Sequence, residues 1–148
     1  MAIINLQGAV YLDNIINPFD SIDDEIKKVK DDGANIIIID FHAEATGEKK
    51  GMGFYLDGKV SAVFGTHTHT QTADEQILPN GTGYITDIGM TGPYYSVLGV
   101  TPEVAIQKMK TNLPVRFTNP DGPCTMEGVV IEIDDRTGKT THIERFRK

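Results

Sequence analysis

A run of β-branched residues in the first third of the chain limits its possible folds more than any other feature. Residues 35 to 42 read Asn-Ile-Ile-Ile-Ile-Asp-Phe-His, with no polar residue interrupting the four isoleucines. Such a run is typical of a strand covered on both faces, as in parallel sheets flanked by helices. It is much shorter than the roughly 18 apolar residues that a membrane span requires, so we expect no membrane segment.

Strand and helix patterns alternate around this run. The predicted strands cover residues 2–6, 35–42, 59–64 and 83–88, and the predicted helices cover 22–32, 44–56 and 101–112. The last segments, 128–133 and 140–146, have the pattern of a hairpin with a turn over 134–139. This order predicts one α/β domain over residues 1–148, with a mixed sheet that ends in an antiparallel hairpin.

The first predicted helix has clear signals at both ends. Asp20 or Ser21 is the expected N-cap, and it follows a predicted loop over residues 14–20 with a turn at Asn17-Pro18. Acidic residues come early in the helix and lysines late, which matches the helix dipole. Gly33 stands where a C-cap is expected.

Charge and composition exclude several classes of function. A net charge of −7 argues against binding of bulk nucleic acid. The single cysteine, Cys124, excludes an internal disulfide, and its proline-flanked loop offers no base to activate a thiol nucleophile. The first residues show neither the basic segment nor the cleavage site of a signal peptide, so we expect a cytoplasmic protein. Glycine-rich phosphate-binding motifs and the G-x-S-x-G motif are absent from the sequence.

Three of the four histidines are predicted to follow strand ends. His67 and His69 form an H-x-H pair just after the strand 59–64, and His42 ends the isoleucine-rich strand. The carboxyl ends of neighbouring parallel strands meet at one edge, where α/β proteins bind ligands. Because imidazole is a common metal ligand, we interpret these three residues as candidate metal ligands. The alternative is that His67 and His69 are surface residues of a threonine-rich loop; His142 is predicted to face solvent from the hairpin.

Five carboxylates lie near these histidines in the sequence, although none is predicted to bind metal. Asp40 is two residues before His42 and can share its face of the strand, or it can bind a backbone amide. The others are Glu44 and Glu48 at helical spacing, with Glu48 expected in solvent, Asp74 at the start of an expected helical turn, and Asp87. The loop 87–94 has two glycines and a proline, which fits either an anion site of backbone amides or a structural turn.

Three blocks in this order resemble the YmdB-like metallophosphoesterases, relatives of the calcineurin-type phosphoesterases. They are DFHAEAT at 40–46, GTHTHTQTADE at 65–75 and TDIGMTGP at 86–93. The resemblance covers essentially the whole chain and implies half of a two-sheet sandwich with flanking helices. It also implies phosphodiester hydrolysis, with cyclic nucleotides as possible substrates. In this family two divalent metals are used, of the iron or manganese type with zinc as an alternative, and His42, His67 and His69 match its last two metal motifs.

The metal motifs of the family's first half are missing from this sequence. The resemblance therefore implies a C-terminal half that lacks the acidic bridging ligand and the Asn-His pair, and no catalytic residue can be assigned. Three neutral imidazoles do not balance two dications, so we expect at most one well-held metal and weak or absent activity alone. We expect a homo-oligomer or a complementing N-terminal-half chain as partner, and a phosphodiester or nucleotide as substrate. Two alternatives stay open, namely a mononuclear three-histidine metal enzyme and a non-catalytic metal- or nucleotide-binding module.

Overall fold

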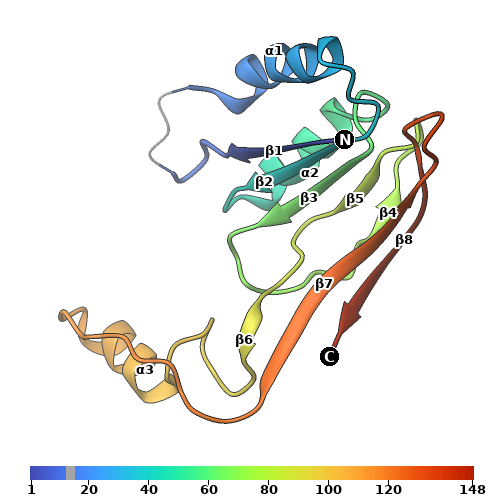
Figure 1. Cartoon of the computed structure of the whole chain (residues 1–148). Helices are drawn as coiled ribbons and strands as arrows, with labels where there is room; N and C mark the ends of the chain where they lie inside the picture. Colours follow the sequence, from blue (N-terminus) through green and yellow to red (C-terminus); the bar gives the residue numbers. More distant parts are fainter. Residues whose placement is uncertain (13–15) are drawn as a thin grey trace.

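A computed structural model describes residues 1–12 and 16–148 of the chain, so part of the predicted loop over 14–20 lies outside the described residues. Its larger sheet has five strands in the order β1-β2-β3-β5-β4 (Figure 1). The strands are β1 (Ala2–Gln7), β2 (Ile37–His42), β3 (Ala62–Thr66), β4 (Gln76–Ile77) and β5 (Gly83–Ile85). β1, β2, β3 and β5 are parallel, and β4 is antiparallel to β5. The predicted parallel core is thereby confirmed.

The C-terminal hairpin belongs to a second, smaller sheet. This sheet has the order β6-β7-β8 and is built from β6 (Thr91–Pro93), β7 (Cys124–Ile133) and β8 (Thr140–Arg147). The carboxylate of Asp134 holds the hairpin turn by accepting hydrogen bonds from the backbone amides of Arg136 and Thr137, both at 2.9 Å. The hairpin is as predicted, but it pairs with β6 rather than extending the mixed sheet. Over the described residues, the predicted α/β class is confirmed, with two sheets and three helices.

The three helices are α1 (Pro18–Asp31), α2 (Thr46–Tyr55) and α3 (Pro102–Thr111). The predicted start of the first helix was wrong, because Asn17 is its N-cap and accepts a hydrogen bond from the amide of Phe19. Pro18 then occupies the first helical position, where its missing N–H is not needed. α3 ends as predicted at Asn112, whose φ of 54° stops the helix. None of these helices, within the part of the chain that is described, is both long and apolar enough to cross a membrane.

The main core lies between the larger sheet and two helices. Ile37, Ile39 and Phe41 of β2 are fully buried against the inner faces of α1 and α2, which contribute Ile22 and Met52 among others. The opposite face of β2 is only half-buried, so the prediction of full cover on both faces was wrong. Ile3 on β1 exposes 66% of its surface. This face of the sheet is therefore open near β1, while the second sheet lies against the β4 and β5 side (Figure 1).

Candidate metal centre

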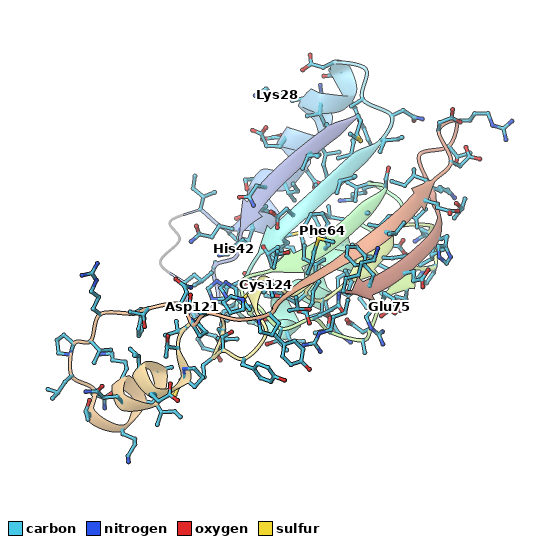
Figure 2. The ribbon with its side chains drawn as sticks, turned by 60° about the horizontal axis from the view of Figure 1, so that its bottom comes forward. Lys28, His42, Phe64, Glu75, Asp121 and Cys124 are labelled. Atoms are coloured by element: carbon cyan, nitrogen blue, oxygen red, sulfur yellow. The ribbon has the colours of Figure 1, made fainter. Side chains whose placement is uncertain are left out.

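The register of the parallel strands brings two of the three candidate histidines into contact. His42, the last residue of β2, is aligned with Thr66, the last residue of β3, and His67 follows Thr66 directly. The Nε2 atom of His42 lies 3.1 Å from the Nδ1 atom of His67. Figure 2 shows His42 at the carboxyl end of its strand, the edge at which ligands bind in α/β proteins.

The groups around these two rings favour one nitrogen of each as the proton carrier. Thr66 donates its hydroxyl proton to Asp40 at 2.8 Å, so its oxygen must accept from the Nδ1 atom of His42 at 3.0 Å. The Nε2 atom of His67 lies 3.0 Å from a carboxylate oxygen of Glu44, which can only accept. In neutral rings with the proton on the outer nitrogen, the two nitrogens that face each other are both acceptors. Two lone pairs at this distance repel unless a cation, a proton or a metal ion, binds to them.

His69 faces the same cavity but contacts a different group. Its Nδ1 atom lies 3.2 Å from the carbonyl oxygen of Leu98, so Nδ1 donates and Nε2 is left as the acceptor. Within residues 1–12 and 16–148, no three His, Cys, Asp or Glu side chains are grouped closely enough to hold a metal ion by themselves. The structure thus brings together a histidine pair with a third histidine nearby, rather than a complete three-ligand set.

The backbone of the H-x-H segment is strained. His67 has a φ of 106° and His69 a φ of 60°, in the region that side chains other than glycine rarely adopt. Such strain persists only where the surrounding structure imposes it, and it is concentrated at functional sites. The two histidines consequently need neighbours that hold the segment in place.

The histidine cavity has a volume of about 450 Å³. Its other walls are formed by residues 89–93, by Leu98 and Gly99, and by Asn119. The amides of the loop 87–94 have internal partners, because Gly89 donates to Asp87 and Met90 donates to Glu127. Of the two interpretations of this loop, these bonds favour a structural turn over an anion site.

Two of the five carboxylates touch the histidine network. Asp40 accepts hydrogen bonds from Thr66 and from Asn5, so it orients His42 through Thr66. Glu44 contacts His67 directly. Neither carboxylate contacts the two ring nitrogens that face each other. Each one instead holds the orientation of one ring from its outer side. This arrangement is typical of groups that fix the tautomer of a ligating histidine.

The other three carboxylates have structural partners. Glu48 was predicted to lie in solvent, but it accepts hydrogen bonds from the amides of Ala9 and Val10. Asp74 was predicted to start a helical turn, which is wrong. It instead accepts from the hydroxyls of Thr72 and Thr86 and precedes the short strand β4. Asp87 is fully buried and pairs with a lysine.

That lysine, Lys49, was missed by the sequence analysis. Its Nζ atom lies 2.7 Å from Asp87, and each of the two side chains is 1% exposed. A lysine on a predicted amphipathic helix is normally assigned to the solvent face, so residue type gave no signal of burial. The position of Thr66 at the same sheet edge as His42 could have been predicted from the parallel pairing of their strands, whereas the Leu98 carbonyl could not.

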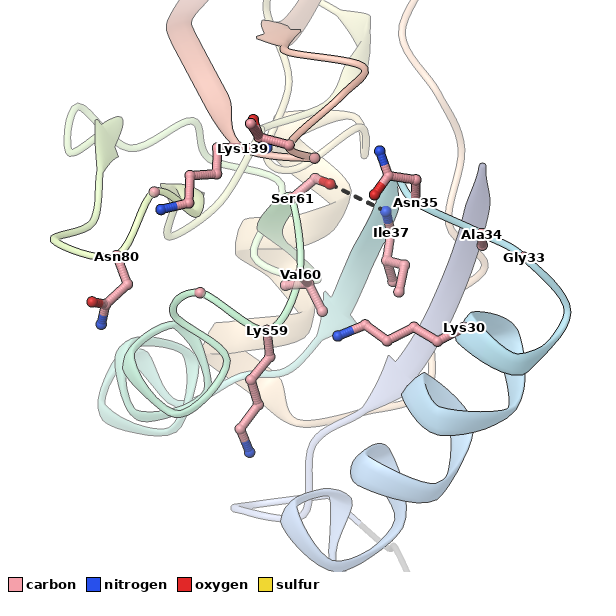
Figure 3. Close-up of a pocket in the computed structure, with 14 residues that line it drawn as sticks. Lys30, Gly33, Ala34, Asn35, Ile37, Lys59, Val60, Ser61, Asn80 and Lys139 are labelled. Atoms are coloured by element: carbon pink, nitrogen blue, oxygen red, sulfur yellow. Dashed lines mark hydrogen bonds between the residues drawn. The ribbon is translucent and has the colours of Figure 1, made fainter.

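A second cavity, of about 370 Å³, lies at the amino ends of β2 and β3, away from the histidines. Lys30, Lys59 and Lys139 line it, and their side chains point in different directions rather than toward one point (Figure 3). Lys59 is already paired with Asp23 at 2.9 Å. Because this cavity contains no histidine and no convergent polar groups, the histidine cavity is the candidate functional site.

Two packed sheets and three helices in the described residues, with histidines at the carboxyl ends of parallel strands, make this an α/β protein, and its likeness to a solved phosphatase assigns it to the metallophosphoesterase fold. The chain belongs to the YmdB-like protein family, whose model matches residues 1–146. It is 55% identical over 146 residues to the 2′,3′-cyclic-nucleotide 2′-phosphodiesterase of Bacillus subtilis strain 168. That match covers 99% of this chain and 55% of the relative.

Two solved structures have the same fold. A novel phosphatase of Mycoplasma pneumoniae matches with a TM-score of 0.89 and 37% identity, over 99% of this chain and 52% of that chain. A hypothetical protein of Thermus thermophilus matches with a TM-score of 0.91 and 33% identity, over 99% of this chain and 56% of that chain. The chain therefore spans about half the length of the relatives that it matches.

Proposed function

We propose that this chain carries the histidine side of a metal-dependent phosphodiesterase site. The observation that carries this proposal is the pair of ring nitrogens, Nε2 of His42 and Nδ1 of His67, that face each other at 3.1 Å. The outer nitrogens lie 3.0 Å from the Thr66 hydroxyl and 3.0 Å from a Glu44 carboxylate oxygen, so the inner nitrogens are the pair left to face a cation.

The donor set fits a divalent transition metal. Two nitrogens that each lie ~2.0–2.1 Å from one ion are ~3.0–3.4 Å apart at ordinary coordination angles, and the spacing here falls in that range. Imidazole suits iron and zinc, whereas manganese prefers oxygen ligands, so we propose iron, or manganese with oxygen ligands from a partner, and zinc as the alternative. His69, with its Nδ1 atom held by the Leu98 carbonyl, is proposed as the third donor.

A bound divalent ion would supply an activated water and positive charge to neutralise a phosphodiester in its transition state. The chain's own residues orient the donors: Asp40 acts on His42 through Thr66, and Glu44 acts on His67. Removing such supporting groups typically weakens metal affinity by ~10–100-fold. No residue of this chain is assigned as the catalytic acid or base.

The proposed substrate is a phosphodiester, and specifically a cyclic nucleotide. This step rests on the name of the Bacillus subtilis relative and on a cavity within the ~300–1,000 Å³ range of small-molecule sites. The proposed location is the cytoplasm, a reducing compartment that is compatible with the exposed free thiol of Cys124.

The proposed partner is either a second copy of this chain or a chain that resembles the rest of the family fold. The chain covers only 55% of the Bacillus subtilis relative, and one sheet face remains open around Ile3. An acidic ligand from such a partner would complete the charge balance that three imidazoles lack.

Calorimetric titration with Mn²⁺ tests the metal proposal. We expect binding of at most one ion per chain, with His42→Ala and His67→Ala each weakening the affinity at least tenfold. His142→Ala is the matched control, because that histidine is exposed on β8, where its ring lies 3.5 Å from Glu144. Equal affinity in all four proteins would overturn the assignment of the ligands.

Activity is then measured on a 2′,3′-cyclic nucleotide, with and without the first half of a family member. We expect little or no turnover by the chain alone and a gain of at least tenfold on addition of the first half of the family member. Metal binding with no turnover in either case would contradict the phosphodiesterase proposal and would favour a non-catalytic binding module.

A further inference from the structure

The buried ion pair of Lys49 and Asp87 lies beneath the H-x-H segment. Lys49 reaches Asp87 from α2, which packs on the sheet behind β2 and β3 (Figure 1). Its stem passes over β3 at Gly65, where an added Cβ atom would come within 3.0 Å of the Lys49 Cδ atom. A glycine at this position leaves room for the lysine.

The Asp87 carboxylate connects three parts of the chain. Its Oδ2 atom accepts the Lys49 ammonium at 2.7 Å and the backbone amide of Thr68 at 3.1 Å. Its Oδ1 atom accepts the amide of Gly89 at 3.0 Å. Thr68 is the residue between the two strained histidines, and Gly89 lines the histidine cavity. One carboxylate thus holds both the H-x-H segment and the opposite wall of the cavity.

A buried ion pair of this kind adds little to stability on average. The loss of hydration of two charges offsets most of their attraction, and apolar replacements of similar volume are often as stable. What the pair does provide here is a fixed acceptor for the Thr68 amide, because Lys49 holds the Asp87 carboxylate from the rigid helix α2. The positive φ values of His67 and His69 require such an outside constraint.

We propose that Lys49 and Asp87 are positioning residues that set the backbone of the H-x-H segment and thereby aim its two imidazoles. Lys49 holds Asp87 in place, Asp87 holds the Thr68 amide, and the flanking histidines take their orientation from that amide. This inference deepens the proposed metal-binding function and rests on it for its effect on affinity, but the hydrogen bond at Thr68 can be measured without metal.

The test compares Asp87→Asn and Lys49→Met/Asp87→Asn with the unmodified chain. An asparagine offers one acceptor oxygen for the two backbone donors, Thr68 and Gly89, so one of them must lose its bond. The double variant removes both charges and leaves no unpaired ion in the core, which keeps the test informative if Asp87→Asn alone fails to fold. Amide hydrogen exchange at Thr68 and calorimetric Mn²⁺ affinity are measured on each folded protein.

Thr82→Val is the matched control. Thr82 is buried and bridges the Gly58 amide and the Val60 carbonyl, at the end of β5 away from the histidines. Its loss should lower stability without changing the H-x-H segment. We expect exchange at Thr68 to accelerate at least tenfold, and Mn²⁺ to bind at least tenfold more weakly, in both Asp87 variants but not in Thr82→Val.

The outcomes separate this inference from the proposed function. Unchanged exchange at Thr68 in a folded Asp87 variant overturns the positioning role, whether or not metal binds. Faster exchange with unchanged Mn²⁺ affinity also overturns it, provided that His42→Ala weakens binding. If the unmodified chain binds no Mn²⁺, the proposed function fails, and faster exchange at Thr68 then still supports the backbone constraint.

Discussion

Replacing Gly65 by alanine tests how tightly the larger sheet is packed at its carboxyl edge, the edge that carries His42, His67 and His69. Gly65 lies on β3, one residue before Thr66 and two before His67. A Cβ atom at this position would lie 1.8 Å from the carbonyl oxygen of Thr86, where real Cβ contacts are essentially never under 3.0 Å. The Thr86 backbone must therefore move by more than about an ångström, because a carbonyl cannot rotate away as a side chain can.

The expected loss of stability follows from two contributions. Overpacking of a well-packed site costs about 1–3 kcal/mol. The movement also breaks the hydrogen bond from the Ile88 amide to the Gly65 carbonyl, 3.0 Å long, and leaving such a group unpaired costs about 1–3 kcal/mol. Together they predict a loss of about 2–6 kcal/mol in the free energy of unfolding, large against the ~5–15 kcal/mol of a typical domain.

Urea unfolding monitored by circular dichroism measures this loss. Gly51→Ala is the control, since Gly51 lies in the middle of α2 and its Cβ atom would meet only the Phe19 ring edge at an ordinary 3.6 Å. The same added methyl should there be neutral or stabilising by up to about 1 kcal/mol. A Gly65→Ala protein that unfolds at the unmodified midpoint, or a Gly51→Ala protein that is equally destabilised, would refute the packing argument.

Three further predictions concern stability. Asn17→Ala removes the cap on the Phe19 amide and should cost about 0.5–2 kcal/mol by urea unfolding. Burial raises the pKa of Tyr84 to about 12 from 10.0. The contribution of Tyr84 to the free energy of unfolding is therefore fully present below pH 10 and is lost as the pH rises to 12. Tyr84→Phe should abolish that alkaline loss, which is on the order of 1–3 kcal/mol. Burial alone raises the pKa of Asp74, but hydrogen bonds led by that from Thr86 outweigh it and the net pKa is lowered. Its stabilisation is therefore present above the unfolded value of 3.8 and is lost as pH falls below it, and acid titration of Asp74→Asn should lack that loss.

The parallel sheet and its histidine edge were predictable because both depend on local patterns. The run Ile36–Ile39 indicates a core strand, and the strand order places its carboxyl end beside that of β3. An H-x-H pair directly after a strand must then lie at the same edge as His42. The register that aligns His42 with Thr66 comes from the structure, because the predicted strand 59–64 ends two residues before β3 does.

The remaining features depend on contacts between distant segments, which a single sequence does not reveal. Lys49 can be buried because it pairs with Asp87, which lies 38 residues away in the sequence. The helix that carries the lysine gives no sign of this. The position of Glu48 is likewise decided by the amides of Ala9 and Val10. Short strands such as β4 and β6, with two and three residues, have no period to detect.

Charge balance limits what the histidine edge can hold by itself. The nearest carboxylates already have partners: Asp40 accepts a hydrogen bond from Thr66, Glu44 lies against His67, and Asp87 forms an ion pair with Lys49. Two dications ~4 Å apart repel by roughly 16 kcal/mol even at an effective dielectric constant of 20, four times the value for unit charges. Neutral imidazoles supply nothing to offset this repulsion. A second metal therefore requires an anionic ligand from another segment, and adding that segment should change the stoichiometry of Mn²⁺ binding from one to two.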